Sequence, residues 1–173
     1  DRWKPTWISP FLGVRETHRL VGRYVLKEQD LTAGLADQEH EDIVAIADHS
    51  IDFHGARPSR AVPNGPYGIP FRCLLPRELD NLLVACRGAS FSSIGASSFR
   101  LSRTLMVLGQ AAGTAAALCH GELSALDADA LRRTLQSDGV ALDLPSGYLD
   151  AMADIAPLPD RDFAPGQPYE IDA

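Results

Sequence analysis

The sequence predicts an α/β fold, and three observations support this. Residues 82–86 (LLVAC) form an apolar run between polar flanks, and because the run does not alternate it is typical of a buried strand in a parallel sheet. A loop of small residues with five serines at 90–98 follows, and then an Ala-, Leu- and Met-rich helix is expected from about 102 to 120. Upstream, partial alternation at 14–26 is typical of an antiparallel strand, and 68–75 have the composition of a strand that Pro70 interrupts.

The N-terminal part of the chain is expected to combine irregular, extended and helical segments. Residues 1–12 have no clear period and should form an irregular connector. Partial alternation over 14–26 predicts a half-buried antiparallel strand or a bent pair. Residues 27–34 predict one short helix that ends near Gly34. Residues 40–46 suit a helix turn or a strand.

Proline, glycine and aspartate divide the remaining chain. Residues 55–68 are a turn-rich loop, and 68–75 follow as a strand that an internal proline confines to an edge or a bulge. A capped amphipathic helix is expected over 125–135, with Asp127 as its N-cap. The Pro- and Asp-rich tail that begins at residue 143 is expected to be irregular.

The helix expected at 102–120 carries a face of small residues. Gly109, Ala112, Gly113 and Ala116 recur at spacings of three or four, which places them on one side of the helix. Glycine inside a helix costs about 0.5–1 kcal/mol relative to alanine. Two of them therefore indicate a packing reason, such as the close approach of a sheet or a second helix.

The composition limits the functional classes. The 173 residues are 45% hydrophobic, which is enough for a core, and a net charge of −7 without a basic cluster argues against a nucleic-acid partner. No apolar run approaches the roughly 20 residues that span a bilayer. The chain begins at Asp1 rather than Met, which indicates a processed, trimmed or partial chain.

The metal-ligating residue types do not predict a metal site. Cys73, Cys86 and Cys119 lie in apolar patterns without metal spacing, which indicates buried, reduced thiols and fits a cytoplasmic location. The histidines and aspartates between 40 and 54 match no standard cluster. We therefore expect no metal.

A buried strand, a loop of small residues and a helix N-terminus can together form an anion or cofactor site. The free N–H groups of the first helical turn point outward, and the macrodipole adds roughly half a positive charge there. Many α/β proteins contain this unit without a ligand, so the unit alone leaves both interpretations open.

Three motifs resemble a family of bacterial FAD-dependent oxidoreductases. NLLVACR at 81–87, Arg100 and TLMVLGQAAGTAAAL at 104–118 resemble its C-terminal strand, loop arginine and helix. GVRETHR at 13–19 resembles its G-x-R-E-[ST]-R-R element, and YGIPFRCLLP at 67–76 resembles its Y-x-I-P-Y-R-x-L-x-P element. The three motifs stand in the family's order with similar spacing.

The resemblance implies an incomplete two-domain flavoprotein. Residues 1–80 would be a portion of a substrate domain with mainly antiparallel strands. Residues 81–121 would be the last strand, loop and helix of a Rossmann-like FAD-binding domain, and 122–173 a terminal helix and irregular tail. The G-x-G-x-x-G fingerprint that opens a dinucleotide-binding domain is absent from this sequence. The chain is therefore expected to be the C-terminal part or a subunit of such an enzyme, inactive and without FAD unless an N-terminal FAD-binding portion, in the same chain or a separate subunit, completes it.

The resemblance also implies an activity and a set of cofactor contacts. Hydride would pass from an unknown small organic substrate to flavin N5, and the helix start at 102–105 would stabilise the charge that develops at N1 and O2. The amides of Thr104 and Leu105 would face the pyrimidine edge, and 87–90 would lie near the ribityl chain. The implied cofactor-binding residues are Arg87, Gly88, Ala89, Ser90, Arg100, Ser102, Arg103, Thr104 and Leu105.

Three positions depart from the family's pattern. Arg103 stands where the family usually has the first-turn proline, and it would either add positive charge near O2 or reach into solvent. Cys86 stands where glycine is usual, and Ser93 where histidine is frequent. If that histidine transfers a proton in the family, His54 or Tyr67 would take its place here.

Two arginines and one histidine have a second interpretation. Arg72 is a candidate anion or flavin contact, or else the partner of an acidic residue in an ion pair. Arg15 would either line the flavin or substrate cavity or form a surface salt bridge, and His54 would be either a proton-transfer group or an ordinary surface histidine. The candidate catalytic residues are His54, Arg72 and Tyr67.

Two other functional hypotheses stay open. The chain could be a non-catalytic binding or scaffold module that kept the fold and lost the chemistry, or an unrelated α/β domain with chance similarity. An N-terminal partner bearing G-x-G-x-x-G would favour the enzyme. A flavin without contacts to Arg87 and Arg100 would favour the scaffold.

Overall fold

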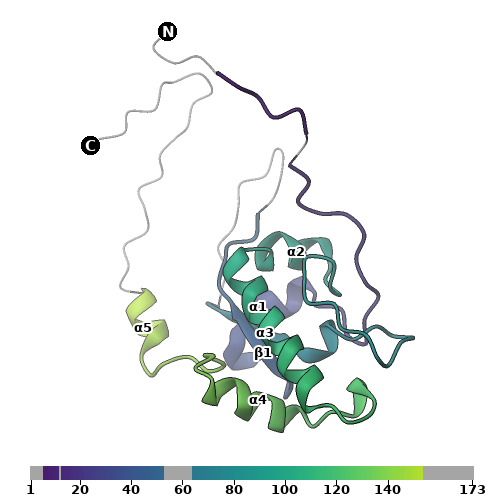
Figure 1. Ribbon diagram of the computed structural model, residues 1–173. Coiled ribbons are helices and arrows are strands. Elements are labelled where there is room, and N and C mark those ends of the chain that lie inside the picture. Colours follow the sequence, from purple (N-terminus) through teal and green to yellow (C-terminus); the bar gives the residue numbers. More distant parts are fainter. Residues whose placement is uncertain (1–5, 12, 53–63, 154–173) are drawn as a thin grey trace. The chain divides into compact units, whose positions relative to one another are not determined.

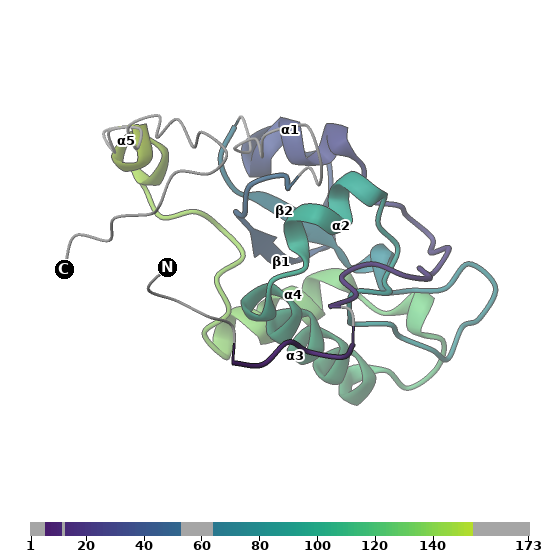
Figure 2. The ribbon, with the colours of Figure 1, turned by 90° about the horizontal axis from the view of Figure 1, so that it is seen from above.

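The computed structural model describes residues 6–11, 13–52 and 64–153, and the chain divides into two compact units, 1–143 and 144–173. In the first unit a pair of strands lies between α1 on one side and α3 with α4 on the other (Figures 1 and 2). The described elements of this unit are α1 (Glu28–Asp37), β1 (Ile43–Ala47), β2 (Tyr67–Pro70), the 3-10 helix η1 (Phe71–Cys73), α2 (Ser93–Phe99), α3 (Ser102–Leu118), the 3-10 helix η2 (Leu123–Ala125) and α4 (Ala128–Ser137). The second unit contains α5 (Tyr148–Ala153).

The two strands pair antiparallel and form the centre of the core. Ala47 pairs with Tyr67 and Ala45 with Ile69, and the register shifts between Ile43 and Ala45. The stretch that suited a helix turn or a strand is thus a strand, as its β-branched residues favour. β2 ends at Pro70, which cannot donate to a ladder, and the chain turns directly into η1. The strand predicted at 68–75 is therefore confirmed only in its first part.

The buried parallel strand predicted at 82–86 is wrong for this structure. These residues have no strand assignment, and Leu82 is 42% exposed. Cys86 is exposed as well and Cys119 is half-buried, so of the three thiols predicted to be buried only Cys73 is. Val84 N–H donates to the Leu74 carbonyl at 2.9 Å, but no ladder forms. A parallel strand needs neighbouring strands for its backbone groups. Within the described residues the sheet consists of two antiparallel strands, β1 and β2, and does not include residues 82–86.

Residues 14–26 are extended but do not form a continuous strand. Isolated bridges join Gly22 to Pro76 and Leu26 to Phe91. Leu20 N–H also donates to the Gly88 carbonyl at 2.7 Å. The predicted half-buried strand is thus an extended segment that two different parts of the chain hold in place.

The three helices predicted in the first unit are present, and one further helix, α2, was not predicted. α3 and α4 are confirmed, and Asp127 caps α4 by accepting from the amides of Asp129 and Ala130. α1 is also confirmed but runs to Asp37, and Gly34, at φ 72°, kinks it in the left-handed region that glycine tolerates.

α2 was not predicted, because a Ser- and Gly-rich sequence has low helix propensity. Ser92 Oγ accepts from Gly95 N–H at 3.0 Å and so begins this helix as its N-cap. In the part that the structure describes, the serine-rich stretch is therefore largely helical rather than a loop.

α3 presents its small-residue face to solvent in this structure. Leu108, Ala111 and Ala115 are fully buried and pack into the core. A Cβ added to Gly109 or Gly113 meets nothing within 4 Å. The close packing that the glycines predicted is therefore absent among the described residues, since the apolar side chains on the opposite face are the ones the core uses.

Replacing Gly109 or Gly113 by alanine should stabilise this chain. Each helix-interior substitution is expected to raise the free energy of unfolding by about 0.5–1 kcal/mol, because open space surrounds both positions. Urea denaturation of the purified chain measures this. Gly34→Ala is the matched control and should destabilise, because its φ is 72° and the added Cβ would meet Asn64. A loss of stability in both α3 variants would mean that this face is covered.

Candidate functional site

The junction between α2 and α3 has the features of an anion-binding helix start. Leu101 is the N-cap of α3 and offers no side-chain acceptor, and the first turn carries no acidic residue. The first helical hydrogen bond runs from Leu105 N–H to the Leu101 carbonyl at 3.0 Å. The amides of Ser102, Arg103 and Thr104 therefore precede the hydrogen-bonded ladder, at the positive end of a 17-residue helix.

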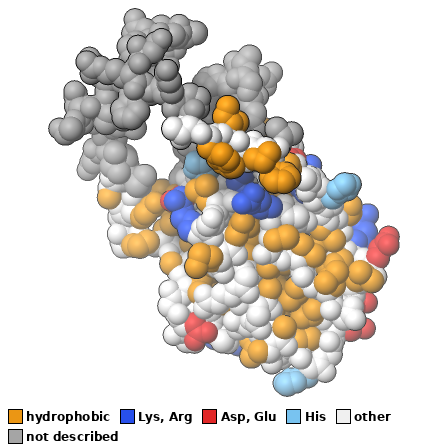
Figure 3. Space-filling view, turned by 45° about the horizontal axis from the view of Figure 1, so that its top comes forward, with side chains coloured by type: hydrophobic (Ala, Val, Ile, Leu, Met, Phe, Trp, Pro, Cys, Tyr) orange, Lys and Arg blue, Asp and Glu red, His pale blue; other side chains and the backbone are white. Residues whose placement is uncertain are grey.

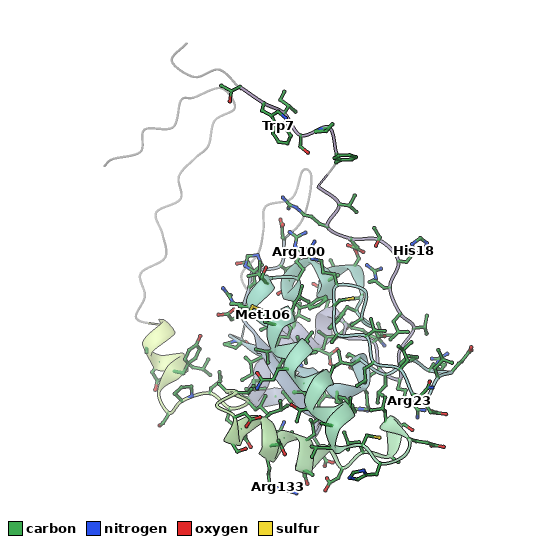
Figure 4. All side chains as sticks on the ribbon, viewed as in Figure 1. Trp7, His18, Arg23, Arg100, Met106 and Arg133 are labelled. Atoms are coloured by element: carbon green, nitrogen blue, oxygen red, sulfur yellow. The ribbon has the colours of Figure 1, made fainter. Side chains whose placement is uncertain are left out.

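Two arginines flank this helix start, and each is paired with an aspartate. Arg100 pairs with Asp52, and Arg103 pairs with Asp48. Figure 4 shows Arg100 at the end of the domain where α3 begins. Figure 3 shows Lys and Arg side chains gathered in the upper half of one face, with acidic side chains mostly toward its edges. Both aspartates come from the segment that follows β1.

Arg15 joins the same group through a longer contact. Its NH1 atom lies 3.5 Å from Asp52 Oδ2, so Asp52 faces both Arg15 and Arg100. The salt-bridge interpretation of Arg15 is therefore the one that the described contacts support. Its neighbour Glu16 pairs with Arg19 and accepts from Ser93 Oγ at 3.2 Å. Ser93, the position where the resembled family often has histidine, is thus engaged with the 13–19 motif.

The side chains expected at the helix start differ in their exposure. Thr104 is buried, Ser102 is exposed and Leu105 is half-buried. Because Leu105 N–H already donates to Leu101, its amide is taken up by the helix itself. Ser102, Arg103 and Thr104 are the first-turn residues whose amides lie before the helical ladder, and Ser102 and Arg103 are the exposed ones.

The loop expected near the ribityl chain is partly internal. Ser90 is fully buried, and its Oγ accepts from Gly22 N–H at 2.9 Å. Ala89 is also fully buried, whereas Arg87 is exposed and Gly88 accepts from Leu20. A Cβ on Gly22 would lie 2.6 Å from Ser90 Cβ, so these two segments require a glycine there. The structure thus uses Ala89 and Ser90 for packing.

Arg72 is held by an internal network. Its Nε donates to Asp42 Oδ2 and its NH2 to Asp42 Oδ1, each at 3.0 Å, and this pairing raises the pKa of Arg72. A third contact of 3.2 Å joins its NH2 to His40 Nδ1, and the guanidinium lies 5.3 Å from the centre of the Tyr24 ring. The ion-pair interpretation of Arg72 is confirmed.

The other two candidate catalytic residues lie differently. Tyr67 is fully buried, its hydroxyl donates to Ser98 Oγ at 2.8 Å, and burial raises the pKa of its phenol. His54 lies outside the described residues. Arg72 pairs with Asp42, and Tyr67 binds Ser98. None of these contacts joins the two candidate residues to each other.

Sequence reasoning missed the acidic partners of the arginines. Asp48 and Asp52 were considered only as metal ligands, and among the described residues no group of three or more His, Cys, Asp or Glu could hold a metal ion. Their pairs with Arg103 and Arg100 span 55 and 48 residues of sequence. Nothing in a single sequence specifies contacts at such separations. The described part of the chain also has no helix that is both long and apolar enough to cross a membrane.

A sequence model of the FAD-dependent oxidoreductase family matches residues 2–135, well over half of the chain. The chain belongs to this family. FAD is thus its cofactor, and the chain is an oxidoreductase at the level of the family. No curated protein and no solved structure matched the oxidoreductase.

The described residues of the oxidoreductase fit one end of FAD. An uncapped helix start beside Arg100 and Arg103 suits the electron-rich pyrimidine edge of a flavin. The adenosine and pyrophosphate end needs a parallel sheet with a glycine-rich turn, and the described sheet is a two-stranded antiparallel pair.

Proposed function

We propose that the chain is the C-terminal part or a subunit of an FAD-dependent oxidoreductase, in which the start of α3 faces the N1–O2 edge of the flavin. The observation that carries this proposal is the uncapped α3 N-terminus between Arg100 and Arg103, in a chain that belongs to the family. The substrate would be a small organic molecule that gives up a hydride. Its identity is not specified by these residues.

The chain's own contribution is electrostatic and positional. When bound, FAD would supply the redox chemistry by accepting a hydride, and negative charge would then develop at its N1–O2 edge. The amides of Ser102, Arg103 and Thr104 point out from the positive end of α3 and favour that charge. Arg100 and Arg103 add positive charge on either side, moderated by their aspartate partners. The helix amides already hold this orientation before the reaction, so little reorganisation of them is needed.

An N-terminal FAD-binding portion is proposed as the partner that completes the site. It would cover two surfaces that the described residues leave open: the 82–86 run, which has strand composition but no ladder, and the Gly109 and Gly113 face of α3. Three free cysteines support a reducing, cytoplasmic location.

A non-catalytic scaffold is the second candidate. Arg72 and Tyr67 both use their polar groups in internal hydrogen bonds, and the residue at the family's frequent histidine position, Ser93, binds Glu16. If His54 does not supply proton transfer, none of the three candidate catalytic residues is left to act as the acid or base. This favours a module that keeps the fold and has lost the reaction.

An absorbance spectrum between about 350 and 500 nm tests the proposal. The chain is purified alone, and again after co-expression with its N-terminal portion. Flavin bands only in the co-expressed sample are expected. Bands from the chain alone would contradict the need for a partner, and a flavin-free co-expressed sample would favour the scaffold. Gly109→Leu with Gly113→Leu, which keep the α3 start intact, should remove the bands if the partner covers that face.

A further inference from the structure

A buried hydrogen-bond chain links β2 to the segment that follows β1. Tyr67 Oη donates to Ser98 Oγ at 2.8 Å, and Ser98 Oγ donates to the His49 carbonyl. Both side chains are fully buried. A serine hydroxyl has one proton, and the carbonyl takes it, so the tyrosine must be the donor in the first bond. Burial raises the pKa of Tyr67 above the ordinary value of a phenol, so this proton is retained in alkaline solution as well as at neutral pH.

The hydrogen-bond chain ends at the His49 carbonyl, which lies in the sequence between the two aspartates that pair with the arginines. His49 follows Asp48, the partner of Arg103, and precedes Asp52, the partner of Arg100. Ser98 lies in the last turn of α2, immediately before the α2–α3 junction. The same serine therefore connects the acidic segment to the helix end that carries its basic partners.

The ion pairs need such a support, because one of them is largely in solvent. The side chains of Arg103 and Asp48 are 62% and 46% exposed. An exposed pair of this kind contributes about 0–1 kcal/mol and does not fix its own geometry. The hydroxyls of Tyr67 and Ser98, in contrast, are fully buried, and the hydrogen bonds that they donate have a defined direction.

We propose that Tyr67 and Ser98 are positioning residues: they fix the 48–52 segment and thereby the arginines on both sides of the α3 start. The effect of this positioning on a bound flavin rests on the proposed function. Tyr67 then acts through Ser98 and the two aspartates, and not as the proton-transfer group that the sequence suggested. The positive charge that the flavin's N1–O2 edge would meet is set by a hydroxyl pair in the core.

The first test follows the arginines directly in the full chain. The Nε–Hε signals of Arg100 and Arg103 are recorded by NMR in Ser98→Ala and Tyr67→Phe. We expect both signals to shift and their Hε exchange to become faster. The shift should be smaller in Tyr67→Phe, because the bond from Ser98 to His49 survives. Tyr24→Phe, which deletes a hydroxyl bound to Asp30 elsewhere, is the matched control and should leave both signals in place.

The outcomes separate positioning from the proposed flavin site. Unchanged arginine signals in a folded variant, Tyr67→Phe being available if Ser98→Ala does not fold, would overturn the proposal. In the FAD-loaded protein Ser98→Ala should also lower the flavin reduction potential. The positive charge that stabilises the reduced flavin is less well ordered in this variant and therefore stabilises it less. Shifted arginine signals with an unchanged potential would support the positioning role and overturn the location of the flavin.

Discussion

Replacing Asp42 by alanine is expected to lower the free energy of unfolding by about 2–3 kcal/mol. Asp42 is buried and accepts three hydrogen bonds from Arg72: from its backbone N–H, from Nε and from NH2, each at 3.0 Å. Truncation leaves the guanidinium without its carboxylate. The loss stays below that of a fully buried pair, because the Arg72 side chain is 45% exposed and water relieves part of it.

Urea denaturation of Asp42→Ala, Arg72→Met and the double variant measures this coupling. The double variant should be more stable than the sum of the single losses predicts, because the second substitution removes the charge that the first leaves unpaired. Asp80→Ala is the matched control. Its carboxylate pairs with Arg23 at an exposed site, so about 0–1 kcal/mol is expected. Strict additivity of the two losses would contradict an energetically coupled pair.

The network around Asp42 also determines which ring nitrogen of His40 accepts a hydrogen bond and which donates one. Arg72 NH2 can only donate, so His40 Nδ1 must accept from it at 3.2 Å. Nε2 then carries the proton and donates to Asp30 Oδ1 at 2.9 Å. Asp30 also accepts from the Tyr24 hydroxyl and from Lys27 N–H. Arg72 is thus one member of a network that joins α1 to the start of β1, although its side chain stays 45% exposed.

The sequence was informative where a feature depends on its near neighbours in the chain. α4 could be predicted because Asp127 caps it locally, and the start of α3 because its composition changes at 102. The 82–86 strand was mispredicted because a strand depends on partners that its own sequence does not specify. The candidate site shows the same difference between features set by neighbouring residues and features set by distant contacts. The helix start was predicted, but its aspartate partners and the Ser98 support come from contacts between residues 31 to 55 positions apart in the sequence.

Stability should fall steeply in alkaline solution, above about pH 9. Burial raises the pKa of the Cys73 thiol and of the Tyr67 and Tyr24 phenols, and the Tyr24 bond to Asp30 adds to the increase for that residue. Above their ordinary pKa values the unfolded chain has released protons that the native chain still holds. Since the unfolded state then binds fewer protons, the free energy of unfolding decreases as the pH rises. Below that range both states are protonated, and these groups contribute no slope.

Single variants separate the contributions of these groups. Urea denaturation at neutral pH and at about pH 10.5, above the ordinary pKa of both residue types, gives the pH-dependent loss for each protein. Cys73→Ala and Tyr67→Phe should each be less stable than the parent at neutral pH, because a buried sulfur or hydroxyl is lost. Both should nevertheless lose less stability on going to the higher pH, because one titrating group is gone. If the loss in both variants equals that of the parent, the alkaline unfolding comes from surface charge repulsion and not from these buried groups.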